Sequence, residues 1–133
     1  MEYEVVIPGR FSSLNEFILA NRTGKGNWNK GNKMKQADQL RICSYIAEQL
    51  HRINIDSPVE LHYRFYEPNK KRDLDNISGY FHKIFQDALV ECGTIHNDSW
   101  LYIVGFEDSF YVDNKNPRIE ITIKEVQNGR IQN

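Results

Sequence analysis

The amino-acid sequence predicts an α+β fold, in which one domain packs a mixed β-sheet against helices. Three observations predict it. The chain has 133 residues, a length that suits a single domain. Segments of alternating polar and apolar residues, typical of strands, are interspersed with segments of helical periodicity. No internal repeat or linker divides residues 1–133, so we expect one domain whose last residues, 126–133, form a frayed tail.

The first third of the chain opens with a predicted strand and a short helix. Residues 2–7 are rich in β-branched side chains, and Pro8-Gly9 ends them. Ser13 is followed three residues later by Glu16 and then by apolar residues, the capping-box pattern that starts a helix. Residues 23–31 contain three glycines and two lysines, which predicts a loop.

Two segments of helical periodicity dominate the middle of the chain. Residues 32–53 place apolar side chains at helical spacing and predict a long helix. Residues 76–92 predict the clearest helix, and Gly93 stands where helices commonly end in glycine. Between them, residues 59–66 alternate apolar and polar side chains, which predicts a half-buried strand.

The last third of the chain is predicted to hold two more strands. These are residues 100–106 and residues 118–126. The sequence DNKNP at residues 113–117 is typical of a turn and separates them.

The basic residues are clustered. A net charge of −1 argues against a uniformly basic nucleic-acid-binding protein. Residues 22–35 nevertheless contain five basic residues and no acidic one, and Lys70-Lys71-Arg72 form a second cluster. Such clusters either bind phosphate or belong to an ordinary solvated surface, and composition does not separate the two interpretations.

Several classes of protein are excluded. No apolar run is long enough to span a bilayer and the start lacks the features of a signal peptide, so we expect a cytoplasmic protein without membrane contact. Cys43 and Cys92 are interpreted as reduced thiols. The histidines lack zinc-ligand spacing, and His62 and His82 are interpreted as surface residues. No nucleophile elbow or nucleotide-binding glycine motif is present, so no small-molecule cofactor is expected.

The strongest candidate for chemistry is the segment KKRDLDN at residues 70–76. In an extended segment, Asp73 and Asp75 point to the same face while Leu74 turns towards the core. Two neighbouring carboxylates suit Mg²⁺, which binds one or two carboxylates together with water and substrate phosphate. The alternative is a pair of solvated loop residues. An EF-hand is excluded, because Ser78 and Ile84 occupy the positions of its glycine and glutamate.

The predicted helix after this pair carries a polar line. Asn76, Lys83 and Asp87 are seven and four residues apart and fall within about 20° of each other around a helix. They form either part of a site beside the two aspartates or an exposed face with a Lys83–Asp87 pair. Asp98 follows the helix, and it reaches the Asp73 and Asp75 end only if the chain folds back that far.

At this point the chain resembles a known family. The sequence RDLDN, a helix ending in K-x-x-x-D-A-L, and then G-x-I-x-N-D before a strand are similar to the RusA-like crossover junction endodeoxyribonucleases, most of all to their phage and prophage branch. The resemblance covers residues 57–126 well and the N-terminal third in outline. Two positions depart from the family pattern: Gly79 stands where shorter members have a lysine, and Asn97 precedes Asp98 where many members have a second aspartate.

The resemblance implies residue roles. Asp73, Asp75 and Asp98 would bind Mg²⁺, with Mn²⁺ as a substitute, and Lys83 would be the catalytic lysine. Asn76 and Asp87 would support them. The residues expected to bind DNA phosphates are Arg10, Arg22, Lys25, Lys30, Lys33, Lys35, Lys70, Lys71 and Arg72.

The implied function is Mg²⁺-dependent resolution of Holliday junctions by paired, symmetric phosphodiester hydrolysis, in recombination and repair. The implied fold is RusA-like, and a C₂ homodimer would supply the two matched active sites. Three alternatives stay open from the sequence. They are a non-catalytic protein that binds branched DNA, a nuclease that acts on other branched DNAs, and a structural protein without metal chemistry.

Overall fold

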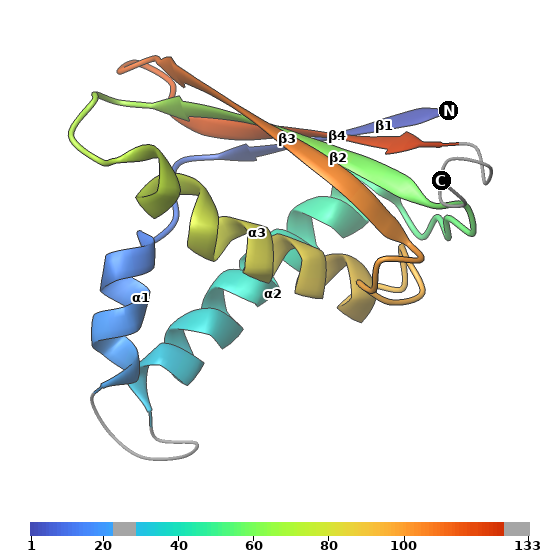
Figure 1. Cartoon of the computed structure of the whole chain (residues 1–133), viewed down its shortest axis with the longest axis horizontal. Coiled ribbons are helices and arrows are strands. Elements are labelled where there is room, and N and C mark those ends of the chain that lie inside the picture. Colours follow the sequence, from blue (N-terminus) through green and yellow to red (C-terminus); the bar gives the residue numbers. More distant parts are fainter. Residues whose placement is uncertain (23–28, 127–133) are drawn as a thin grey trace.

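One mixed β-sheet forms the frame of the protein (Figure 1). The computed structural model describes residues 1–22 and 29–126. The predictions for Lys25 and for most of the tail therefore lie outside the described residues. The sheet has the strand order β1-β4-β2-β3. Its strands are β1 (Glu2–Pro8), β2 (Val59–Glu67), β3 (Ile103–Val112) and β4 (Arg118–Glu125).

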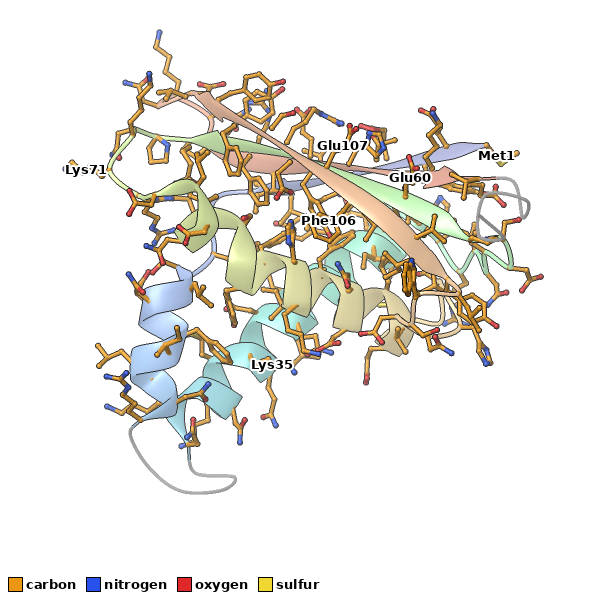
Figure 2. The ribbon with its side chains drawn as sticks, in the orientation of Figure 1. Met1, Lys35, Glu60, Lys71, Phe106 and Glu107 are labelled. Atoms are coloured by element: carbon orange, nitrogen blue, oxygen red, sulfur yellow. The ribbon has the colours of Figure 1, made fainter. Side chains whose placement is uncertain are left out.

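Only β2 and β3 run parallel. The pairs β1–β4 and β2–β4 are antiparallel, so the sheet is mixed, as predicted. The side chains of β2 alternate between buried and half-buried positions, because one face of the sheet is covered by helices and the other is not (Figure 1). Phe106 lies on the helix side of β3 and Glu107 on the opposite side (Figure 2).

The helices are α1 (Leu14–Asn21), α2 (Lys30–Leu50) and α3 (Leu74–Glu91), and they cover one face of the sheet (Figure 1). The apolar stripe of α3 becomes the centre of the core, where Phe81 and Phe85 pack against Tyr63 of β2. Gly93 has a φ of 73°, which explains why a glycine ends this helix. In the described part of the chain no helix is both long and apolar enough to cross a bilayer.

Several predicted boundaries were wrong. Helix α2 begins at Lys30 rather than at residue 32, because the side chain of Asn29 caps it by accepting from the N–H groups of Gly31 and Asn32. Strand β3 begins at Ile103 rather than at residue 100 and continues to Val112 rather than 106. Beyond residue 106 it contains two acidic residues, Glu107 and Asp108, that the sequence pattern did not place in a strand.

The direction of α3 follows from the parallel strands. Since β2 and β3 run the same way, the helix between them must return antiparallel to both. Its N-terminus therefore lies beside the end of β2, and its C-terminus leads to the start of β3 (Figure 1).

Candidate functional site

Two carboxylates without partners stand at the start of α3. Asp73 is the N-cap residue, with φ −68° and ψ 154°, but its side chain makes no capping hydrogen bond. Asp75 lies in the first turn of the helix, and both residues are exposed. Neither carboxylate has a hydrogen-bond or ion-pair partner among the described residues. A helix N-terminus favours negative charge, and both carboxylates are available to a cation.

The local geometry differs from the extended segment expected from the sequence. The helix starts at Leu74, two residues before the predicted start, so Asp75 lies within its first turn while Asp73 is the extended residue just before it. Leu74 is 57% exposed rather than turned into the core. Asp73 has the extended backbone of an N-cap residue and the helix begins directly after it, although its side chain makes no capping hydrogen bond.

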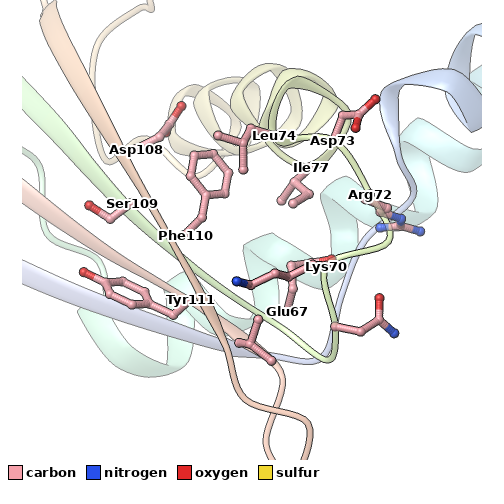
Figure 3. A pocket seen from close by; sticks show the side chains of 12 residues that line it. Glu67, Lys70, Arg72, Asp73, Leu74, Ile77, Asp108, Ser109, Phe110 and Tyr111 are labelled. Carbon is pink, nitrogen blue, oxygen red and sulfur yellow. The ribbon is translucent and has the colours of Figure 1, made fainter.

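Asp73 and Leu74 line a groove of about 970 Å³. It lies between the β2–α3 connection, the first turn of α3 and the second half of β3 (Figure 3). Its other lining residues are Glu67, Asn69, Lys70, Arg72, Ile77, Asp108, Ser109, Phe110, Tyr111 and Val112. The groove thus combines an uncommitted carboxylate with an apolar wall.

The basic residues near the groove differ in their freedom. Arg10 forms an ion pair with Glu67 at 2.5 Å. Arg72 donates to the carbonyl oxygen of Phe11 at 2.9 Å and to Glu16 at 2.8 Å. Both arginines were predicted to bind DNA, but in the structure their side chains form intramolecular contacts around the N-terminus of α1.

Lys70 and Lys71, by contrast, have no side-chain partner in the part of the chain that the structure describes. Lys70 lines the groove, and Lys71 projects from the β2–α3 connection (Figures 2 and 3). Both lysines are therefore free to meet a phosphate at this end of the molecule.

The polar line along α3 packs towards the other helices. Asn76 accepts a hydrogen bond from the backbone N–H of Asn15 at 3.3 Å. Asp87 bonds two lysines, Lys35 at 3.0 Å and Lys83 at 3.4 Å. Lys83 stands eight residues after Asp75, about 12 Å further along the helix. The Lys83 side chain is 61% exposed, so its ammonium group is accessible to solvent.

Asp98 lies at the opposite end of α3. It lines a smaller cavity of about 330 Å³ together with Gln86, Trp100 and the first half of β3. Since α3 has 18 residues, its two ends are about 27 Å apart. The structure therefore does not bring Asp98 to Asp73 and Asp75 within one chain. In agreement, the described residues contain no cluster of three or more acidic, histidine or cysteine side chains that could hold a metal ion.

The sequence analysis did not predict one further polar contact beside the groove. His82 of α3 contacts Asp108 of β3 at 2.7 Å, and its ring packs against Phe106 and Tyr63. His82 is largely buried, although it was interpreted as a surface residue. The two residues are 26 positions apart on different elements, so no local pattern links them.

Comparison with known proteins defines the class. A search of curated proteins found no match. The sequence model described as "Endodeoxyribonuclease RusA" matches residues 20–124, which is well over half of the chain. The protein is therefore an endodeoxyribonuclease by class. It belongs to the RusA family, which confirms the resemblance found in the sequence; the phage and prophage branch stays a prediction.

Proposed function

We propose that this protein is a Mg²⁺-dependent endodeoxyribonuclease that resolves four-way DNA junctions by paired, symmetric cuts in recombination and repair. The observation that carries the proposal is the pair of uncommitted carboxylates, Asp73 and Asp75, beside two free lysines at one end of α3. The same segment falls inside the match to the endodeoxyribonuclease family.

The donor set fits a magnesium ion in part. Mg²⁺ binds through one or two carboxylates and completes its shell with water and substrate phosphate, and Mn²⁺ accepts the same oxygen ligands. Asp73 and Asp75 would supply these carboxylates, and a third would hold the ion more firmly. When bound, such an ion activates water and stabilises charge on a phosphodiester.

The chain's own residues would position the DNA. Lys70 and Lys71 bind backbone phosphates at the rim of the groove, without reading sequence. Lys83 stabilises the negative charge that develops on the phosphate, and Asp87, which also pairs with Lys35, orients Lys83.

Lys83→Met is expected to lower kcat strongly and leave junction affinity nearly unchanged. Lys124→Met, an exposed lysine on β4, is the matched control.

The position of Asp98 supports a homodimer. Asp98 is at the wrong end of α3 to join Asp73 in its own chain. A two-fold axis beside α3 would set two copies of the helix antiparallel, so that the end carrying Asp98 meets the partner's Asp73 and Asp75. Such a dimer has two complete sites, each with carboxylates from both subunits. This supplies the paired cuts that junction resolution requires.

The first test is cleavage of a synthetic mobile four-way junction with and without Mg²⁺. Wild type is compared with Asp75→Asn, with Asp56→Asn as a control at another exposed aspartate, and plain duplex DNA is run beside the junction. Paired nicks that need Mg²⁺ and are lost only in Asp75→Asn would support the proposal. Tight binding without cutting in Mg²⁺ or Mn²⁺ would favour a non-catalytic branched-DNA-binding protein. Better cutting of flaps or forks would favour another branched substrate.

A second test asks whether Asp98 acts in the partner's site. Asp75→Asn and Asp98→Asn are each expected to be inactive and to bind Mn²⁺ weakly, as read by electron paramagnetic resonance. A mixture of the two forms heterodimers in which one site has all three carboxylates, so Mn²⁺ binding and single nicking return. If the mixture neither binds Mn²⁺ nor nicks DNA better than the two variants alone, Asp98 does not complete the partner's site.

A further inference from the structure

The two cysteines of the chain lie side by side in the fold, although they are far apart in the sequence. Cys43 is on α2, and Cys92 is the C-cap residue of α3. The thiol of Cys43 donates to the carbonyl oxygen of Ala88 at 3.8 Å, and the backbone N–H of Cys92 donates to the same oxygen at 2.9 Å. The two thiols are also hydrogen-bond neighbours of each other. The packing of α2 on α3 therefore creates a thiol pair that the sequence alone did not reveal.

The thiol pair can be reached from solvent on the side of Cys43. Both cysteines are free and partly exposed. Cys43 lines a cavity of about 350 Å³ together with Gln36, Gln39, Leu40 and Glu91. Leu40 is 73% exposed and Glu91 is exposed as well, so the cavity lies at the surface. A cavity of this volume admits a small molecule to the sulfur of Cys43.

The two thiols differ in their readiness to react. A thiolate, rather than a thiol, attacks a disulfide. Burial, together with the neighbouring thiol of Cys43, raises the pKa of Cys92 to about 12, so Cys92 keeps its proton at neutral pH. Cys43 is therefore the thiol that a reagent in the cavity meets first, and Cys92 is placed to react with the sulfur of Cys43 afterwards.

We propose that Cys43 and Cys92 form a modification site that reacts with small-molecule disulfides, such as oxidised glutathione, and becomes a reversible disulfide between α2 and α3. The thiolate of Cys43 attacks one sulfur of the reagent, forms a mixed disulfide and releases the first small thiolate. Cys92 then loses its proton to solvent and attacks the sulfur of Cys43, which releases the second small thiolate. The protein loses two hydrogen atoms, and the reagent is reduced to two thiols.

The disulfide would close a long loop, because β2 and all of α3 lie between its two ends. Such a bond stabilises a protein mainly by restricting the unfolded chain, and its effect grows with the length of the loop. The groove beside Asp73 is at the opposite end of α3 from Cys92. Oxidation therefore strengthens the fold without covering the carboxylates at the start of α3, and the inference does not depend on the proposed function.

Mass spectrometry of the whole protein, incubated in its folded state with oxidised glutathione, tests the site. Wild type is expected to lose two hydrogen atoms and to carry no glutathione. Cys92→Ser should stop at one glutathione adduct, because nothing resolves the mixed disulfide. Cys43→Ser should react roughly 10-fold more slowly or less, because Cys92 has little thiolate.

The double variant Cys43→Ser/Ser44→Cys is the matched control. Ser44 is exposed, and its side chain points about 100° away from that of Cys43 around α2. This variant should form the glutathione adduct but no internal disulfide. An internal disulfide that forms equally well in the control, or in wild type only after unfolding in urea, would overturn the proposal. A wild type that stays reduced or stops at the adduct would overturn it too.

Thermal unfolding followed by circular dichroism measures the effect on the fold. Oxidised wild type should have a Tm roughly 10 °C above that of the reduced protein, and dithiothreitol should reverse the gain. Cys43→Ser should show no gain with oxidised glutathione, and its spectrum checks that it is folded. An internal disulfide that leaves the Tm unchanged would overturn its role in stabilising the fold.

Discussion

Capping side chains set the start of the short helix α1. The Ser13 side chain accepts from the backbone N–H of Glu16 at 3.1 Å, and the Glu16 carboxylate accepts from the backbone N–H of Ser13 at 2.9 Å. The hydrogen bond from Ser13 holds the pKa of Glu16 below its usual value. Glu16 also bonds Arg72, so the cap connects α1 to the segment that carries Asp73.

Ser13→Ala should lower the free energy of unfolding by about 1 kcal/mol, because one backbone N–H loses its partner. Urea denaturation measures the change. Ser12→Ala, at the neighbouring serine, is the control and should change stability by less than about 0.5 kcal/mol. If the two substitutions change the free energy of unfolding equally, the capping hydrogen bond of Ser13 does not stabilise the protein.

The Asp38 carboxylate is partly buried and accepts from the Tyr80 hydroxyl at 2.7 Å. Burial raises the pKa of Asp38 above its usual value, so the folded state disfavours the charged form. The resulting loss of stability is present above the folded pKa and disappears as pH falls below the ordinary value of 3.8. Asp38→Asn should therefore have a higher Tm than wild type at pH 7, with the gap closing near pH 3. A lower Tm at pH 7 would mean that the bond from Tyr80 to a charged acceptor outweighs burial.

At the scale of elements, the approach of α1 to α3 depends on Gly79. A Cβ at this position would lie 3.1 Å from Cδ2 of Leu14, closer than side chains normally pack. A glycine inside a helix lowers stability by about 1 kcal/mol relative to alanine. The close contact explains why the chain has glycine at the position where shorter family members have a lysine.

Gly79→Ala should stabilise the protein by about 1 kcal/mol in a Leu14→Ala background, where the added methyl group has room. In the wild-type background the gain should be smaller, because Leu14 must shift. A double-mutant cycle from urea denaturation gives the coupling directly. If Gly79→Ala raises the free energy of unfolding by the same amount in both backgrounds, the side chain at position 79 does not interact with Leu14 of α1.

The elements that the sequence predicted well are those whose burial is periodic. Strand β2 and helix α3 each bury one regular face, so alternation and helical spacing revealed them. Strand β3 was cut short because Glu107 and Asp108 interrupt its apolar pattern. These two carboxylates contact His62 and His82 from other elements, and sequence spacing does not reveal such pairs.

The candidate site was predictable in part for the same reason. The aspartates of the D-x-D motif are neighbours in sequence, and their place at a turn before a helix follows from local signals. The location of Asp98 depends on whether β3 runs parallel or antiparallel to β2. That choice is made by pairing between distant strands, which is why the separation of Asp98 from Asp73 emerged only from the fold.

At the scale of the whole molecule, positive charge is concentrated in local clusters, although the net charge is close to zero. The net charge is −1, yet one end of the molecule carries free lysines beside the groove. Phosphate binding at this end would release counterions from DNA, so affinity should fall as salt rises.

Lys70→Ala should weaken junction binding for all sequences alike and reduce the slope of log K against log salt by about 1. Fluorescence anisotropy over a salt series measures both. Arg72→Ala should instead lower the Tm of the free protein, because Arg72 holds the Phe11 carbonyl oxygen and Glu16. If Lys70→Ala leaves the slope of log K against log salt unchanged, Lys70 does not bind a DNA phosphate.

The strand order also determines when the chain can finish folding. Strand β1 begins at residue 2, but its partner β4 begins only at Arg118 and separates it from β2. During synthesis the first strand therefore has no neighbour in the sheet until residues 118–125 have left the ribosome. Pairing over such a sequence distance is slow. The β-branched segment at residues 2–8 thus stays unpaired for longer during synthesis than any other strand of the sheet.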